Sequence, residues 1–173
     1  SSCGRIFDAV AAAVGICRNS ISFDGQAAMK LESIVQKQSY APYTINIENK
    51  SDNHYFKHLN LKPMWIEILN DLQKKVLPSI ISAKFHQGLS TAISNLIIET
   101  YRWKRKNVSN KNVVALSGGV FQNQILKNLT EKKLKKANFI VISHQKLPSN
   151  DGCIALGQAI VANAIIDNLK SQT

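Results

Sequence analysis

The sequence lacks the patterns that mark several large classes of protein. It has only three cysteines, Cys3, Cys17 and Cys153, and no Cys-x-x-Cys pair. An odd, scattered set of cysteines argues against a disulfide framework and against a structural zinc site. The sequence also has no Gly-x-x-x-x-Gly-Lys loop, nucleophile elbow or Ser-His-Asp order. P-loop nucleotide hydrolysis and acyl-enzyme hydrolysis therefore have little support.

Secretion signals, long apolar runs, internal repeats and low-complexity segments are also absent from the sequence. No uninterrupted apolar stretch reaches the roughly 18 residues of a membrane span. We therefore expect a cytoplasmic protein that does not contact a membrane. With 173 residues, 45% of them hydrophobic, the chain is long enough to bury one core. It begins at Ser1 without an initiator methionine, so we expect a natural truncation or a piece of a longer polypeptide.

Positive charge exceeds negative charge, with 22 Lys and Arg against 11 Asp and Glu. The excess gathers at residues 102–106 and 132–136, both near predicted helix ends, where cations complement the helix dipole. This distribution weakens the case for a nucleic-acid surface, and we do not expect nucleic-acid binding. A basic surface that receives an acidic protein tail or a nucleotide is at least as good an interpretation.

Hydrophobic periodicity predicts a helix-rich α/β protein. Apolar residues recur at helical spacing over residues 4–14, 26–36, 64–77, 79–104, 122–137 and 151–169. Residues 113–116 and 139–143 read as buried strands, and residues 39–62 as an insert that forms a short hairpin or irregular segment. Because the last two strands alternate with helices, we expect them to pair in parallel through a right-handed crossover.

Two loops that follow these strands are candidate ligand sites. Gly118 and Gly119 join the first strand to a helix, where the backbone can approach a ligand closely and free amides favour an anion. Asn123, one helical turn later, would face the same ligand. A purely structural turn is the alternative. Both loops leave the carboxyl edge of the sheet, where ligands bind in open α/β folds.

The second loop carries Asp151, directly before an apolar helix. Either Asp151 or Asn150 is a helix N-cap, or Asp151 is a carboxylate for a metal or phosphate site.

Other candidate residues have competing interpretations. Arg5 and Asp8 form a surface ion pair, or Asp8 lies beside a ligand at a helix start. His54 and His58 have the i, i+4 spacing of a metal pair if their segment is helical, although a third ligand is missing nearby. His86 fits a buried histidine at the edge of the core better than a catalytic base.

Four segments together resemble the C-terminal part of the hydrogenase maturation carbamoyltransferases of the HypF family. These segments are residues 2–10, 23–29, 116–123 and 147–159. The match spans essentially the whole chain. The resemblance implies one ribonuclease-H-like lobe of the actin-like and sugar-kinase-like ATPase fold, with residues 1–173 as a single lobe of a two-lobe domain. The domain is also similar to proteins that transfer threonylcarbamoyl groups to tRNA.

The resemblance further implies a reaction. In that family, carbamoyl phosphate and ATP give carbamoyl adenylate, and this domain passes the carbamoyl group to the C-terminal cysteine of a partner protein in nickel-iron hydrogenase maturation. The implied nucleotide-binding residues are Asp8 at the ribose, Gly25 beside it, the loop Ser117, Gly118 and Gly119, and Asn123 at the adenine or ribose. Asp151 would bind a divalent metal, which is zinc, iron or magnesium.

The sequence also departs from the family pattern. The family's His-x-x-x-His metal pair lies in the other lobe, and the His54 and His58 pair does not replace it. The acylphosphatase-like, zinc-finger-like and adenylate-forming domains, which would be the remaining partners, are missing too. We therefore expect half a site, which binds nucleotide weakly and is inactive alone. Two alternatives remain: a non-catalytic nucleotide-binding or docking module, and tRNA threonylcarbamoyl transfer. The residue identities at positions 25–29 and 121–123 favour the hydrogenase branch.

Overall fold

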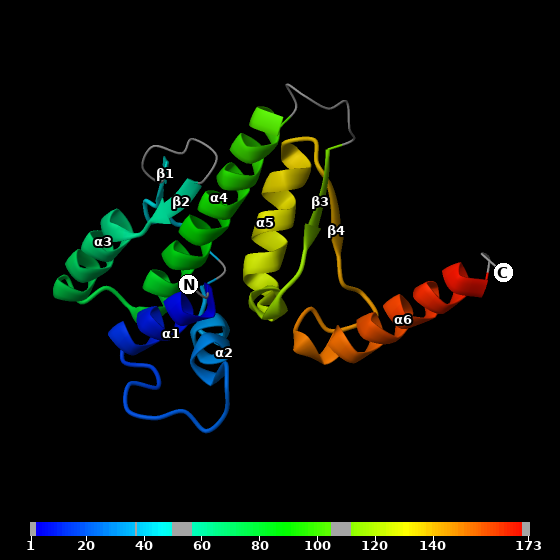
Figure 1. The fold of residues 1–173 in the computed structure, drawn as a ribbon. Helices are drawn as coiled ribbons and strands as arrows, with labels where there is room; N and C mark the ends of the chain where they lie inside the picture. Colours follow the sequence, from blue (N-terminus) through cyan, green and yellow to red (C-terminus); the bar gives the residue numbers. More distant parts are fainter. Residues whose placement is uncertain (1–2, 37, 50–56, 105–111, 171–173) are drawn as a thin grey trace.

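The structure is a computed structural model that describes residues 3–36, 38–49, 57–104 and 112–170. A body of helices is followed by a small β-α-β unit and a projecting C-terminal helix (Figure 1). The elements, in chain order, are α1 (Cys3–Ala13), α2 (Gln26–Ser33), β1 (Asn46–Asn49), β2 (Lys57–Asn60), α3 (Lys62–Gln73), α4 (Pro78–Lys104), β3 (Val113–Leu116), the 3₁₀ turn η1 (Gly119–Gln122), α5 (Gln124–Lys136), β4 (Ile140–Ser143), the 3₁₀ turn η2 (Asp151–Cys153) and α6 (Ile154–Lys170). The predicted helix-rich α/β class is confirmed.

The predicted insert forms an antiparallel hairpin of β1 and β2. His58 lies on β2, with its Nε2 3.5 Å from Glu48 Oε2, while His54 lies outside the described residues. Because His58 sits in extended backbone, the helical geometry that a His54 and His58 metal pair requires is not present there.

Prolines lie in the first turns of two helices, and α3 ends at Gln73, four residues earlier than predicted. α3 starts at Lys62, two residues earlier than predicted, and includes Pro63 in its first turn. α4 starts at Pro78 itself. A proline in the first helical turn costs no hydrogen bond, because the amide that it lacks would have no partner inside the helix.

The C-terminal unit confirms the predicted parallel pairing. β3 and β4 are parallel neighbours, with Val113 opposite Ile140 and Leu116 opposite Ser143, and α5 connects them. One face of this two-stranded sheet packs against α5 and α4 through Leu116. The other face leaves the side chains of Val113, Ile140 and Ile142 exposed.

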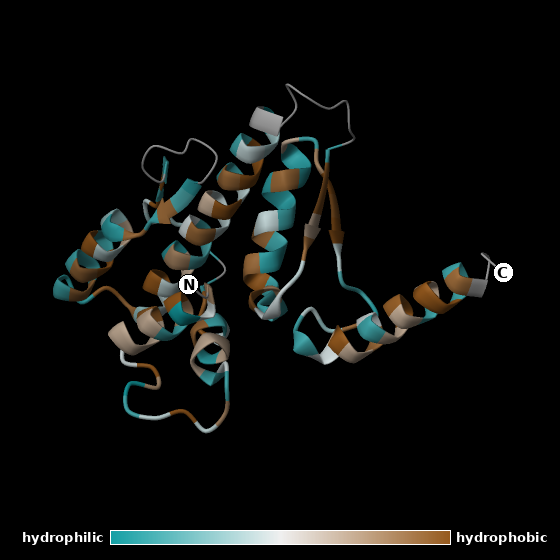
Figure 2. Ribbon diagram, viewed as in Figure 1, coloured by the Kyte–Doolittle hydropathy of each residue, from teal (hydrophilic) through white to brown (hydrophobic). Residues whose placement is uncertain are grey.

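α6 is exposed along its whole described length and projects away from the body as an arm (Figures 1 and 2). Its exposed apolar residues lie on more than one side of the helix: Ile154, Leu156, Ile160, Val161, Ile165, Ile166 and Leu169. Helices with this pattern are normally buried on several sides. The segment Asp151–Leu169 is also long and apolar enough, by length and composition alone, to cross a membrane, which the sequence prediction had missed. A helix enclosed by other protein passes the same test.

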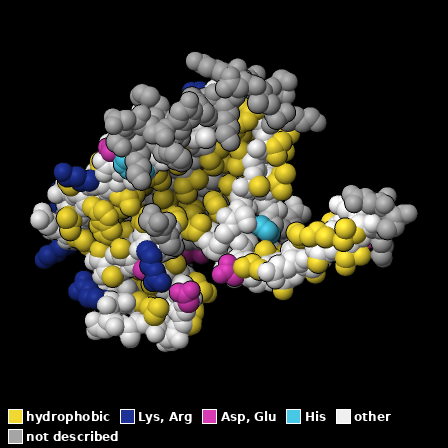
Figure 3. All heavy atoms as spheres, viewed as in Figure 1, with side chains coloured by type: hydrophobic (Ala, Val, Ile, Leu, Met, Phe, Trp, Pro, Cys, Tyr) yellow, Lys and Arg dark blue, Asp and Glu magenta, His cyan; other side chains and the backbone are white. Residues whose placement is uncertain are grey.

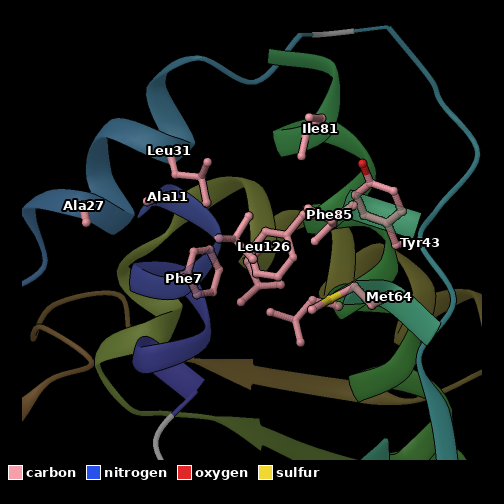
Figure 4. Close-up of a cluster of buried hydrophobic side chains, with 12 residues drawn as sticks. Phe7, Ala11, Ala27, Leu31, Tyr43, Met64, Ile81, Phe85 and Leu126 are labelled. Atoms are coloured by element: carbon pink, nitrogen blue, oxygen red, sulfur yellow. The ribbon is translucent and has the colours of Figure 1, made fainter. Parts of the chain in front are cut away.

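The main core joins α1, α2, α3, α4 and α5 (Figure 4). The rings of Phe7 and Phe85 meet edge to face, with their centroids 4.9 Å apart. Leu31 from α2 and Leu126 from α5 are fully buried in the same cluster. Since Leu126 belongs to the C-terminal unit, this cluster fixes that unit to the helical body.

His86 on α4 is fully buried in this core, as the sequence predicted. Its ring lies 5.4 Å from the ring of Phe7, and its Nδ1 is 2.8 Å from the carbonyl oxygen of Ser82. Burial lowers the pKa of His86 to about 4, and the hydrogen bond to Ser82 only partly opposes this. The imidazole is therefore neutral near pH 7.

The segment that contains Tyr43 crosses α4 closely at Gly88. A Cβ on Gly88 would lie 2.5 Å from the carbonyl oxygen of Tyr43. The backbone of Tyr43 donates a hydrogen bond to Lys84 O (3.3 Å), and its hydroxyl donates to Asp71 Oδ2 (2.7 Å). The first bond holds the segment before β1 against α4 and the second ties it to α3, and only glycine at position 88 leaves room for it.

Gly88→Ala should destabilise the fold by about 1–3 kcal/mol, because the added methyl group must displace the backbone at Tyr43. Chemical denaturation measures the effect. Gly157→Ala is the matched control: nothing lies within 4 Å of a Cβ at that position on α6, so no loss of stability is expected. Equal stability of Gly88→Ala and the wild type would contradict the close crossing.

The pH dependence of stability should carry the signature of His86. Its pKa is 6.5 in the unfolded chain and about 4 in the folded one, so the unfolded state takes up the proton first as the pH falls. The contribution of His86 to the free energy of unfolding is fully present above pH 6.5. It falls by up to roughly 3 kcal/mol towards pH 4. The difference in free energy of unfolding between the wild type and His86→Gln should therefore shrink on acidification. A constant difference would show that His86 is not buried in the neutral form.

Candidate functional site

Segments from both halves of the chain surround one cavity of about 1010 Å³. The walls come from α1, from the turn before α2 together with α2, from η1, and from the turn that begins η2. Figure 3 shows acidic side chains gathered where the helical body faces the root of the α6 arm. The core contacts between α1, α2 and α5 hold these walls together.

Five of the predicted site residues line this cavity: Asp8, Gly25, Gly119, Asn123 and Asp151. They come from four separate segments, and residues 8 and 151 are nearly the whole chain apart. The structure therefore brings together most of the set that the sequence proposed.

Ser117 and Gly118, the other two predicted nucleotide-binding residues, lie beside the cavity rather than in its lining. The hydroxyl of Ser117 is 3.0 Å from His144 Nε2, and the amide of Gly118 donates to Ser149 O at 2.8 Å. The second bond ties the glycine loop to the turn after β4. The prediction that both loops meet at one edge of the sheet is thus confirmed.

Two amides in the first turn of α5 are engaged by side chains. The side chain of Asn123 caps the helix, with its Oδ1 accepting from the amide of Leu126 at 2.8 Å. The carboxylate of Glu32 on α2 accepts from the amide of Ile125 at 3.2 Å. Both amides are therefore engaged, one of them by a negative charge. These two amides are not free to hold an anion, and that part of the prediction now rests on the glycine loop before them.

Asn150, and not Asp151, caps the turn that leads into α6. Its Oδ1 accepts from the amide of Gly152 at 3.1 Å. The cap interpretation therefore holds for Asn150 and leaves the exposed carboxylate of Asp151 at the cavity. Within the described residues, no group of three His, Cys, Asp or Glu side chains gathers as a metal site. These residues alone do not form a metal site, and the metal role of Asp151 stays a prediction.

Asp24 and Glu32 also line the cavity, and the sequence interpretation missed both. Glu32 lies on the same face of α2 as Gly25, because residues 25, 28, 29 and 32 follow helical spacing and all line the cavity. That spacing was the available signal. The hydrogen bond of Glu32 joins it to Ile125, 93 positions away along the chain, and periodicity cannot reveal such a contact.

The cavity is acidic although the chain is basic. Asp8, Asp24, Glu32 and Asp151 contribute carboxylates to it, and Arg5 is the cationic residue of its lining. The guanidinium of Arg5 lies 3.1 Å from Asp8 Oδ2, so the predicted ion pair is present as well. Such a lining suits ligand hydroxyl groups and other donors, and it disfavours a bare phosphate near α1 and α2.

The two cysteines near the cavity have structural surroundings. Burial raises the pKa of the Cys3 thiol, which lowers its thiolate content and its reactivity. The thiol of Cys153 donates to Asn150 O at 3.3 Å and supports the turn. Neither environment is that of an activated nucleophile.

Residues 1–158 match a protein-family model described as the second subdomain of a carbamoyltransferase Kae1-like domain. The chain is 34% identical over 163 residues to the carbamoyltransferase HypF of Synechocystis sp., covering 92% of this chain and 19% of that protein. It is 31% identical to the HypF of Rhodobacter capsulatus, covering 97% of this chain and 20% of that protein. The chain thus spans about a fifth of the length of these curated relatives.

Solved structures give the same result. Full-length HypF in its phosphate- and nucleotide-bound form superimposes with a TM-score of 0.78 and 38% identity, covering 96% of this chain and 21% of that one. HypF of T. kodakarensis shares the fold with a TM-score of 0.75 and 24% identity, covering 97% of this chain and 20% of that one. The family-model match and the identities to these relatives show that the chain belongs to the HypF carbamoyltransferase family.

Proposed function

We propose that this chain is part of a carbamoyltransferase and that its acidic cavity binds the nucleotide portion of carbamoyl adenylate. The observation that carries the proposal is the convergence of Asp8, Gly25, Gly119, Asn123 and Asp151 on one cavity. The matching relatives are carbamoyltransferases, and a similar solved structure is described as phosphate- and nucleotide-bound.

The lining suits a nucleoside. The carboxylate of Asp8 is an acceptor for the two ribose hydroxyls. Gly25 has a φ of +81°, and a Cβ there would enter open space, so the glycine keeps its turn unstrained beside the sugar. Because three of the four carboxylates, Asp8, Asp24 and Glu32, lie on α1, on α2 or in the turn before α2, the phosphate should point towards Gly119.

The reaction requires positioning rather than a nucleophile from this chain. Carbamoyl phosphate and ATP would supply carbamoyl adenylate, and the C-terminal cysteine of a hydrogenase maturation partner would attack its carbamoyl carbon, with AMP as the leaving group. A divalent metal, if one is used, would stabilise charge on the phosphate. Asp151 would be one ligand, and its other ligands would come from outside the described residues.

We also propose that other domains of the enzyme cover α6 and the open face of the β3–β4 sheet. This surface is apolar and exposed, and the matching region makes up about a fifth of each relative. Enclosure by those domains explains the composition of α6 without a membrane. A ribonuclease-H-like lobe needs additional strands on this sheet, which the same domains would provide.

A thermodynamic cycle tests the nucleotide site. AMP and 2′,3′-dideoxy-AMP are titrated against the wild type and Asp8→Asn, with isothermal calorimetry as the measurement. The wild type should prefer AMP roughly tenfold, because a hydrogen bond to a charged group contributes about 1.5–3 kcal/mol. Asp8→Asn should lose most of that preference, since its neutral amide is a weaker acceptor.

Asp167→Asn is the control, because it removes the same charge from exposed α6, outside the cavity lining. It should keep the preference of the wild type. Absence of AMP binding by the wild type at millimolar concentration, or an unchanged preference in Asp8→Asn, would contradict the proposal.

A further inference from the structure

A continuous series of hydrogen bonds connects the N-terminal part of α4 to the first turn of α5. The carbonyl oxygen of Ser82 lies 2.8 Å from Nδ1 of His86. The other ring nitrogen, Nε2, lies 2.9 Å from Nδ2 of Asn123. Oδ1 of Asn123 then accepts from the amide of Leu126 at 2.8 Å. His86 and Asn123 are 37 positions apart in sequence, and both are buried.

The backbone groups at the two ends of this hydrogen-bond series determine the direction of every bond within it. The backbone amide of Leu126 can only donate, so the atom of Asn123 that faces it must be the oxygen. The amide nitrogen of Asn123 then faces His86 and donates to it, which requires an unprotonated Nε2. Nδ1 must carry the proton, because the carbonyl of Ser82 can only accept.

The surroundings of His86 maintain this neutral tautomer. The hydroxyl of Ser82 donates to Leu31 O at 2.6 Å, so its oxygen, 3.4 Å from Nδ1, can only accept from the ring, as the Ser82 carbonyl does. The rings of Phe7 and Phe85 flank the imidazole, with their centroids 5.4 and 5.6 Å from its own, and they limit its rotation. Burial favours the neutral form, in agreement with the lowered pKa.

An apolar residue would fill the volume of His86 equally well, but it would offer no acceptor to Asn123. The amide of Asn123 would then be free to turn, or it would lose a bond in a buried place, where an unpaired donor is costly. Asn123 is 8% exposed and lines the cavity. Its amide has two hydrogens and its oxygen two lone pairs, and the chain of bonds uses one of each.

We propose that His86 is a positioning residue that locks the side-chain amide of Asn123, so that Asn123 offers the cavity one fixed N–H donor and one fixed carbonyl acceptor. The inference rests on the proposed function for its ligand, the nucleotide portion of an adenylate. A fixed donor and acceptor side by side complement a ligand edge that carries an acceptor beside a donor, as the base of an adenylate does. Asn123 touches the ligand, and His86 acts through it.

The first experiment needs no ligand. Nitrogen-15 NMR of the imidazole, with the His86 signals assigned by their loss in His86→Phe, should show a protonated Nδ1 and an unprotonated, hydrogen-bonded Nε2 near pH 7. The Nε2–H tautomer, or a charged ring, would overturn the inference, because the amide of Asn123 would then have to face the other way.

The second experiment measures AMP affinity in three variants. His86→Phe keeps an aromatic ring in the core and removes the acceptor, and it should bind AMP roughly tenfold more weakly. His86→Gln restores a side-chain acceptor and should recover most of the affinity. Ile68→Ala is the control for general damage to the core, because Ile68 is fully buried in the same cluster but lies on α3, outside the cavity lining. It should lower stability and leave the affinity for AMP unchanged.

The outcomes separate this inference from the proposed function. If the wild type binds AMP and folded His86→Phe binds it equally well, the positioning role is wrong. If affinity falls in parallel with stability in all three variants, His86 has only a structural role. If the wild type does not bind AMP, the proposed function and the ligand part of the inference fail together. The tautomer measurement still decides the orientation of Asn123.

Discussion

The capping of α5 by side chains is the constraint on which the rest of the structure depends. Asn123 caps the helix from the position directly before it, and Glu32 on α2 accepts a hydrogen bond from the neighbouring amide of Ile125. Leu126, one turn further, is buried between Phe7 and the other core residues. These contacts fix the C-terminal unit against α1 and α2, and the cavity exists because those elements are held in place. Loss of this joint would remove the core contact and the site together.

The distribution of charge follows from the same arrangement. The lysines that make the chain basic include Lys133, Lys135 and Lys136, in the last turn of α5, where they complement the helix dipole. Four carboxylates gather at the opposite end of that helix, around the cavity. The net charge of +11 therefore says little about the ligand. The local composition of the cavity favours the hydroxyl-rich part of a nucleotide over its phosphate.

Local signals in the sequence predicted most of the elements. β3 was predicted with its observed bounds, because its apolar run is short and clearly bounded. α4 was predicted within one residue, because Pro78 and the helical spacing of apolar residues mark it. The meeting of the two loops followed from the rule for parallel strands. The roles of Glu32 and His86 could not be predicted, since each depends on a bond to a residue 93 or 37 positions away. The membrane-like composition of α6 was missed because its apolar residues are interrupted by Gln158, Asn163 and Asp167.

The central claim is that one cavity, built from both halves of the chain, holds a nucleotide. The most direct test is an amide NMR titration of the isotope-labelled chain with AMP. The account predicts that the shifted signals cluster at α1, at residues 24–32, at residues 118–124 and at residues 150–152. Shifts confined to the lysines at the end of α5, or scattered over the surface, would contradict it.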